Sequence, residues 1–164
     1  KPKIADYPFT TLHPNLGVVN QDNKEFVVAD IPGLIKGAHE GQGLGHRFLG
    51  HVERCKGLIH LIDITSNNII NDYSTIINEI SAYDKNLSEK KQIIVLNKID
   101  AVEKDVIEIA KKKLKKINVN KVICISAVSG QNITNLIRET QDLIVSMLEA
   151  EDNNTQLKNV SWSP

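Results

Sequence analysis

The feature that most constrains the fold is an alternation of short apolar runs with stretches of helical periodicity. Apolar runs at residues 58–64, 93–96 and 122–125 predict buried strands. Helices are expected between and around them, at about 44–56, 69–84, 102–117 and 133–149. Strands that alternate with helices form a parallel sheet covered by helices on both faces, so the sequence predicts an α/β fold.

A hairpin is expected to add an antiparallel edge to this sheet. Residues 16–20 and 25–29 are strand-like, and Gln21-Asp22-Asn23 joins them with turn-forming side chains. The whole pattern predicts a mostly parallel sheet with one antiparallel edge strand.

The tetrapeptide Asn97-Lys98-Ile99-Asp100 follows the strand of residues 93–96 and has the chemistry of a guanine-reading site. Asp100 can accept two hydrogen bonds, from the ring N–H and the exocyclic amine of guanine, and adenine lacks this donor pair. Asn97 would hold the strand end and reach the purine edge, while the aliphatic stem of Lys98 would cover one face of the base. Taken alone, the tetrapeptide fits a polar turn after a strand equally well.

A second motif, Asp30-Ile31-Pro32-Gly33, follows the strand of residues 25–29 and has the form D-x-x-G. The carboxylate of Asp30 can hold a Mg²⁺-bound water. The backbone of Gly33 can approach a phosphate closely and sense the γ-phosphate. This motif predicts the metal side of a nucleotide site.

The third motif, Ser126-Ala127-Val128, follows the last predicted strand. A backbone N–H of this small-residue loop could bond the guanine carbonyl oxygen and help pack Asp100. A strand followed by Ser-Ala is common in parallel sheets, so the motif is weak alone. The ordered series D-x-x-G, N-K-x-D and S-A-x along one chain predicts a site for GTP or GDP with Mg²⁺.

Longer stretches of the chain resemble the Obg family of ribosome-associated GTPases, from Lys1 to roughly Leu148. The residues that carry the resemblance are 5–12, 14–19, 30–35, 41–45 and 47–49. A sister family with a similar Y-P-F-T-T segment reads adenine and usually has N-x-x-E at the base-reading site, and Asp100 argues against it.

The resemblance implies a P-loop NTPase-like GTPase domain over residues 1–150. Residues 151–164 are polar and largely aperiodic, so a linker or a disordered tail is expected there. It implies a cytoplasmic, monomeric GTP-binding switch that hydrolyses GTP to GDP and phosphate during large ribosomal subunit assembly, with K⁺ assisting. The alternative is a guanine-nucleotide-binding module without hydrolysis.

Thr11 and Gly33 are the expected catalytic residues. The hydroxyl of Thr11 would join the Mg²⁺ shell with Asp30, and its backbone carbonyl would orient water, with Thr10 as the competing residue for this role. Many GTPases have a water-positioning glutamine after the D-x-x-G glycine, whereas this chain has Leu34. Intrinsic turnover is therefore expected to be slow.

One departure from the family is large. Its members begin with a strand, a G-x-x-x-x-G-K-[ST] phosphate loop and a helix, which would all precede Lys1, so a fragment of a larger protein is expected. The first strand would lie between the strands that end at Asp30 and Asp63. Without it a gap of about 9 to 10 Å is expected, to be filled by that segment, a partner chain or rearrangement.

The remaining charges and metal-binding side chains give weaker signals. The 20 basic and 20 acidic residues cancel, so no global charge indicates nucleic acid or membrane, and no apolar run is long enough to span a bilayer. A lysine cluster at residues 111–116 is interpreted as a solvated helix face, with contact to ribosomal RNA as the alternative. His51 and Cys55 lie four residues apart, but two ligands do not make a zinc site.

Overall fold

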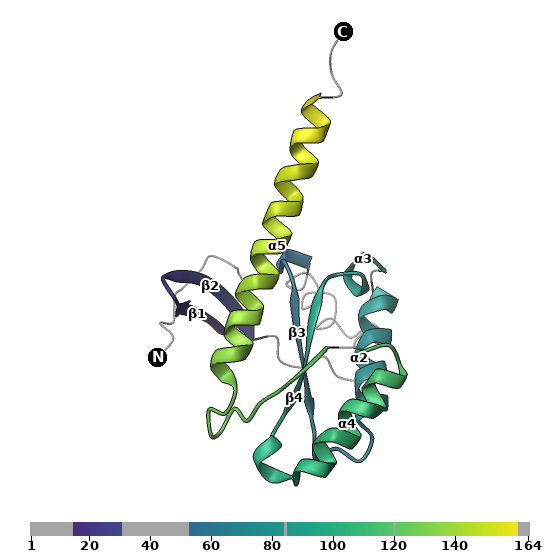
Figure 1. The fold of residues 1–164 in the computed structure, drawn as a ribbon. Coiled ribbons are helices and arrows are strands. Elements are labelled where there is room, and N and C mark those ends of the chain that lie inside the picture. The colour runs from purple at the N-terminus through teal and green to yellow at the C-terminus, as the bar shows by residue number, and fades with distance from the viewer. Residues whose placement is uncertain (1–14, 31–52, 84, 120, 161–164) are drawn as a thin grey trace.

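The computed structural model describes residues 15–30, 53–83, 85–119 and 121–160 of the 164-residue chain. It contains two sheets (Figure 1). The first is an antiparallel hairpin of β1 (Asn15–Gln21) and β2 (Lys24–Asp30). The second is a parallel sheet in the order β3 (Leu58–Asp63), β4 (Gln92–Asn97) and β5 (Val122–Cys124). The strands predicted from apolar runs are confirmed.

The hairpin turn has the geometry that its sequence favours. Gln21 pairs with Lys24, so Asp22 and Asn23 form a two-residue loop. Both have positive φ angles, 52° and 60°. Two positive φ angles are the mark of a type I′ turn, whose twist matches that of the flanking strands, and Asn and Asp tolerate this conformation.

The three longest described helices lie where helical spacing predicts them. The described helices are α2 (Ile69–Tyr83), α3 (Lys85–Ser88), the 3₁₀ turn η1 (Ile99–Ala101), α4 (Lys104–Lys116) and α5 (Ile133–Val160). The short α3 was not predicted. The predicted end of the last helix at residue 149 is wrong, because α5 continues to Val160. Most of the helix expected at 44–56 lies outside the described residues.

The parallel sheet is covered on both faces, as expected for an α/β fold. On one face Ile94 and Leu96 pack with Ile69 of α2 and Leu114 of α4. On the other face Val95 and Ile123 pack against residues of α5, including Ile133. Neighbouring strand residues alternate between the two clusters because successive side chains of a strand point to opposite faces.

The lysine-rich helix α4 mostly presents its lysines to solvent, as predicted. Ala110 and Leu114 are buried on its inner side, while Lys112 and Lys116 are exposed. Val106 shares the helical spacing of the buried residues but is 38% exposed. The inward face of α4 is therefore shorter than the sequence indicates.

Helix α5 connects the two sheets, which share no strand pairing within the described residues. Gln141 Nε2 donates to the backbone carbonyl of Gln21 at 2.9 Å, and Arg138 Nε donates to Asp22 Oδ2 at 3.1 Å. Figure 1 shows α5 lying between the hairpin and the parallel sheet. No described strand pairs with both β2 and β3, and this is the position at which the sequence predicts a gap for the missing first strand.

None of the described helices is long and apolar enough to cross a membrane.

Candidate functional site

Two of the three polar motifs of the sequence lie at the carboxyl edge of the parallel sheet. Strand β3 ends at Asp63 and β4 ends at Asn97, and these two residues are paired in the register. Strand β5 lies beside β4, and the chain leaves it through Ile125 to Ser126. Ligands of open α/β sheets bind outside the carboxyl ends of the strands, so this edge is the candidate site.

Asn97 joins the tetrapeptide to the loop after β5. Its side-chain oxygen accepts a hydrogen bond from the backbone N–H of Ala127 at 3.0 Å. The backbone adds a second link, because the N–H of Ile99 donates to the carbonyl of Ile125 at 3.2 Å. The structure therefore brings together two of the three motifs, which are about 30 residues apart in sequence.

The loop that follows β5 is fixed by its own hydrogen bonds. Ser126 is fully buried, and its hydroxyl oxygen accepts the N–H of Ser129 at 3.1 Å. The N–H of Ser126 donates to the carbonyl of Gln131 at 3.1 Å, and the N–H of Gly130 donates to the carbonyl of Ser126 at 2.9 Å. Val128 is left 91% exposed at the tip. Hydrogen bonds thus fix the two ends of the loop, while its tip at Val128 is exposed to solvent.

Asn132 anchors the end of the loop at the start of α5. Its side-chain nitrogen donates to the carbonyl of Cys124 at 2.8 Å, and its φ angle of 61° places it in the left-handed region that Asn tolerates. Neither Asn132 nor Ser129 was singled out from the sequence, because the contact partners of a loop residue depend on how the loop closes.

Asp100 lies in η1, and its side chain is exposed, while its neighbour Ile99 is buried at 7% exposure. The buried Ile99 fixes the short turn against the core, and the N–H of Ala101 donates to the carbonyl of Lys98 at 3.0 Å. The carboxylate of Asp100 is therefore presented to solvent from an anchored turn.

Lys98 makes a contact that the sequence did not indicate. Its ammonium donates to Asp63 Oδ2 at 2.5 Å, while Asp63 Oδ1 accepts the backbone N–H of Thr65 at 2.9 Å and its hydroxyl at 2.7 Å. The hydrogen bond from Lys98, together with those from Thr65, lowers the pKa of Asp63 to about 2. A signal for Asp63 existed, since it is a carboxylate that directly follows an apolar strand.

The predicted metal side of the site is described only in part. Asp30 is the last residue of β2 and is exposed, and none of the hydrogen bonds given above links it to the cluster on the parallel sheet. Thr11, Ile31, Pro32, Gly33 and His51 lie outside the described residues. Within the described part of the chain, no group of three or more His, Cys, Asp or Glu side chains could hold a metal ion.

The fold and the motifs define the class of the protein as a P-loop GTPase domain. A family profile described as 50S ribosome-binding GTPase matches residues 1–98 of the 164. Because this match covers more than half of the chain, the chain belongs to that family.

Solved structures share the fold at low sequence identity. Era from Aquifex aeolicus bound to GDP and AlF4⁻ matches with a TM-score of 0.60 and 24% identity, covering 87% of this chain and 48% of that one. Era in complex with MgGDPNP and a segment of 16S ribosomal RNA matches with a TM-score of 0.61, 24% identity and the same coverage. A putative nucleolar GTP-binding protein 1 from Plasmodium falciparum matches with a TM-score of 0.58 and 18% identity, covering 90% and 79%. The present chain thus spans about half the length of the Era chains.

Proposed function

We propose that this chain is the nucleotide-binding part of a GTP-binding switch that hydrolyses GTP slowly to GDP and phosphate. The observation that supports this most directly is the hydrogen bond from the Ala127 N–H to Asn97 Oδ1, because it joins the N-K-x-D and S-A-x motifs at the sheet edge. Asp100 is exposed on the anchored turn that follows. This arrangement supports a base-reading site built from two segments that are distant in sequence.

Each base-side residue has a role in this proposal. Asp100 accepts the two guanine donors, the stem of Lys98 covers a face of the base, and Ile99 and Ser126 anchor the two segments. The N–H groups of Ser126 and Ala127 already donate to Gln131 and Asn97. Among these three loop residues, the N–H of Val128 is therefore the one we assign to the guanine carbonyl oxygen.

The metal side follows from the chemistry of Asp30. Its exposed carboxylate is a hard oxygen donor of the kind that Mg²⁺ prefers, so it fits this ion, directly or through water. We assign the hydroxyl of Thr11 to the same metal shell and Gly33, with Ile31 and Pro32, to the phosphate side. Mg²⁺ would neutralise phosphate charge. The resemblance to the Obg family implies that K⁺ would neutralise more of it.

The wider role that we propose is that of an Obg-type cytoplasmic, monomeric GTPase acting in assembly of the large ribosomal subunit. It is supported by the family description and by the residues around Asp30 and the Y-P-F-T-T segment that resemble Obg proteins. Leu34 in place of a water-positioning glutamine favours slow hydrolysis and hence a timing role.

Substitution of Asp100→Asn tests the base-reading assignment. The amide can donate to the second carbonyl of xanthine but cannot accept two guanine donors, so we expect affinity for GDP to fall at least about a hundredfold and preference to move to the xanthine nucleotide. Titration with fluorescent mant-GDP and mant-XDP measures both, and Asp105→Asn on α4 is the matched control. Unchanged guanine preference in Asp100→Asn would remove the basis of the assignment.

The rival function is that of a guanine-nucleotide-binding module without hydrolysis. A phosphate-release assay on the same protein distinguishes this module from the switch. Slow Mg²⁺-dependent release supports the switch. Tight guanine binding with no release supports the module.

A further inference from the structure

The Asp63–Lys98 ion pair spans two neighbouring strands at the sheet edge. Asp63 ends β3 and pairs in register with Asn97, the last residue of β4. Lys98 is the next residue, so its side chain runs back across the edge from β4 to β3 and donates to Asp63 Oδ2 at 2.5 Å. The side chains of Asp63 and Lys98 remain 38% and 53% exposed, so this contact lies on the open side of the site.

The carboxylate of Asp63 is itself oriented by Thr65. Both the backbone N–H and the hydroxyl of Thr65 donate to Oδ1, at 2.9 and 2.7 Å. Oδ2 is thereby turned toward Lys98. A surface carboxylate held by two hydrogen bonds has lost most of its rotational freedom, so it can fix a partner side chain better than a free one.

Lys98 is also constrained at its backbone. Its φ and ψ angles of 66° and 36° lie in the left-handed region, which is uncommon for a residue with a long side chain. Such conformations persist where the surroundings enforce them, and they cluster at functional sites. Lys98 is therefore held at both ends, at its backbone and at its ammonium group, and only the aliphatic stem between them is flexible.

We propose that Asp63 is a positioning residue for guanine-nucleotide binding, which holds the Lys98 ammonium so that the aliphatic stem is extended along the sheet edge before the base arrives. This inference rests on the proposed function. In this proposal Lys98 contributes to nucleotide affinity only together with Asp63, while Asp100 determines which base is bound.

The expected effect follows from preorganisation. An unheld lysine would have to be ordered when the base binds, and this ordering weakens affinity. Because the pair is exposed, the loss should be modest, about twofold to fivefold. It should be equal for GDP and GTP, because the stem contacts the base and not the phosphates. The guanine over xanthine preference should not change.

A double-mutant cycle on the protein in its full natural length tests the proposal. The variants are Asp63→Asn, Lys98→Met and both together, because Asn keeps an acceptor for Thr65 and Met keeps an apolar stem. Mant-GDP affinity is measured for each. We expect Asp63→Asn to weaken binding by the amount above in the presence of Lys98 and to have no effect in the Lys98→Met background. Asp142→Asn, an exposed carboxylate on α5, is the control and should bind normally.

Two results would overturn the proposal. The first is that Asp63→Asn lowers mant-GDP affinity equally with Lys98 present and in the Lys98→Met background, which would mean that Asp63 supports only the fold. The second is that Asp63→Asn does not lower the affinity at all, which would mean that Asp63 does not contribute to binding. If the unsubstituted protein shows no preference for guanine nucleotides, the proposed function fails as well. Intact guanine preference with an unaffected Asp63→Asn variant overturns this inference alone.

Discussion

The polar side chain of His60 packs in the protein as an apolar ring would. It lies on β3, on the face covered by α2, and its ring stacks on Tyr73 with ring centroids 5.3 Å apart and an interplanar angle of 18°. Its Nδ1 is buried without a hydrogen-bond partner. Burial lowers the pKa of His60, and a hydrogen bond with the Gln92 side chain opposes this in part. Burial therefore favours the neutral form of the stacked imidazole.

The lowered pKa of His60 predicts a pH-dependent stability. Below the ordinary pKa of 6.5 the unfolded chain binds a proton that the folded chain resists, so protonation favours unfolding. We expect the free energy of unfolding to decrease as the pH falls from about 7.5 to about 5.5, by at most about 1.4 kcal/mol per pH unit from this group. Urea unfolding at several pH values measures the decrease.

A His60→Phe variant is the control for this pH dependence. Phenylalanine keeps the stacking on Tyr73 but does not titrate, so its unfolding free energy should vary less across the same pH range. An equal pH dependence in both proteins would mean that other groups cause it.

At the scale of the elements, α5 contacts both the parallel sheet and the hairpin. Its first turn begins just after the loop of Ser126, and Ile133 packs under the parallel sheet. Further along the helix, Arg138 and Gln141 contact the hairpin whose second strand ends at Asp30. One helix therefore sets the loop after β5 and the strand that ends at Asp30 relative to each other.

The two contacts of α5 with the hairpin should differ in strength. Gln141 is only 6% exposed, so Gln141→Leu removes a buried donor and leaves the Gln21 carbonyl without it. We expect a loss of about 1–3 kcal/mol in the free energy of unfolding. Arg138→Gln is the matched control on the same helix, because its pair with Asp22 is more than half exposed, and it should change stability much less. Urea midpoints at constant m-value compare the two, and equal effects would contradict the assignment.

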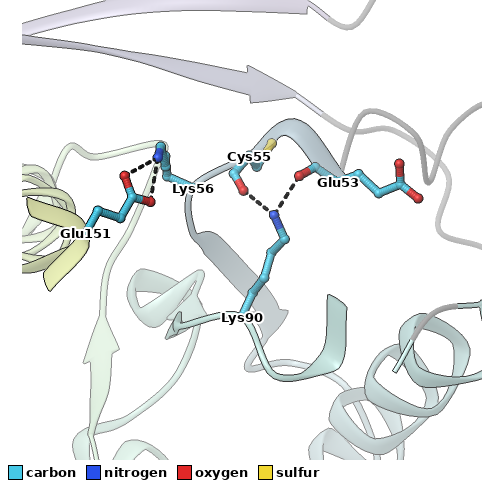
Figure 2. A network of polar contacts seen from close by, with 5 residues as sticks. All are labelled: Glu53, Cys55, Lys56, Lys90 and Glu151. Atoms are coloured by element: carbon cyan, nitrogen blue, oxygen red, sulfur yellow. Dashed lines mark hydrogen bonds and ion pairs between the residues drawn. The ribbon is translucent and has the colours of Figure 1, made fainter. Parts of the chain in front are cut away.

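For the molecule as a whole, a polar network ties three distant segments together. Lys90, in the connection between α3 and β4, donates to the carbonyl of Glu53 at 2.7 Å and to the carbonyl of Cys55. Lys56, next to them, pairs with Glu151 on the extension of α5 at 2.6 Å. Figure 2 shows the Lys90 ammonium between the two carbonyls and the Lys56 pair beside it. The residues that lead into β3 are thus fixed from two sides.

The two halves of this network should contribute unequally to stability. Lys90→Met keeps the stem but removes a charged donor from two backbone carbonyls, so we expect a loss of about 1–3 kcal/mol in the free energy of unfolding. Glu151→Gln removes only a pair whose side chains are 53% and 56% exposed, and we expect a loss below about 1 kcal/mol. Thermal or urea unfolding of the two variants provides the comparison. A larger effect of Glu151→Gln would mean that the α5 extension is held mainly by this pair.

Much of the architecture could be predicted because it depends on local pattern. The apolar runs before Asp63, Asn97 and Ser126 indicated parallel strands, and alternation or helical spacing indicated which residues are buried. The order of the motifs indicated that the N-K-x-D and S-A-x segments belong to one site. The hydrogen bond from the Ala127 N–H to Asn97 was not predicted.

The sequence by itself therefore determined the class of fold, the order of its elements and the sheet edge at which the N-K-x-D and S-A-x motifs lie, because these follow from hydrophobic periodicity and strand order. Only the tertiary structure decided that Lys98 is paired with Asp63, that α5 joins two sheets through Gln141, and that α5 continues to Val160. These features depend on contacts between residues that are far apart in sequence, and such contacts are set by how packed elements meet in space.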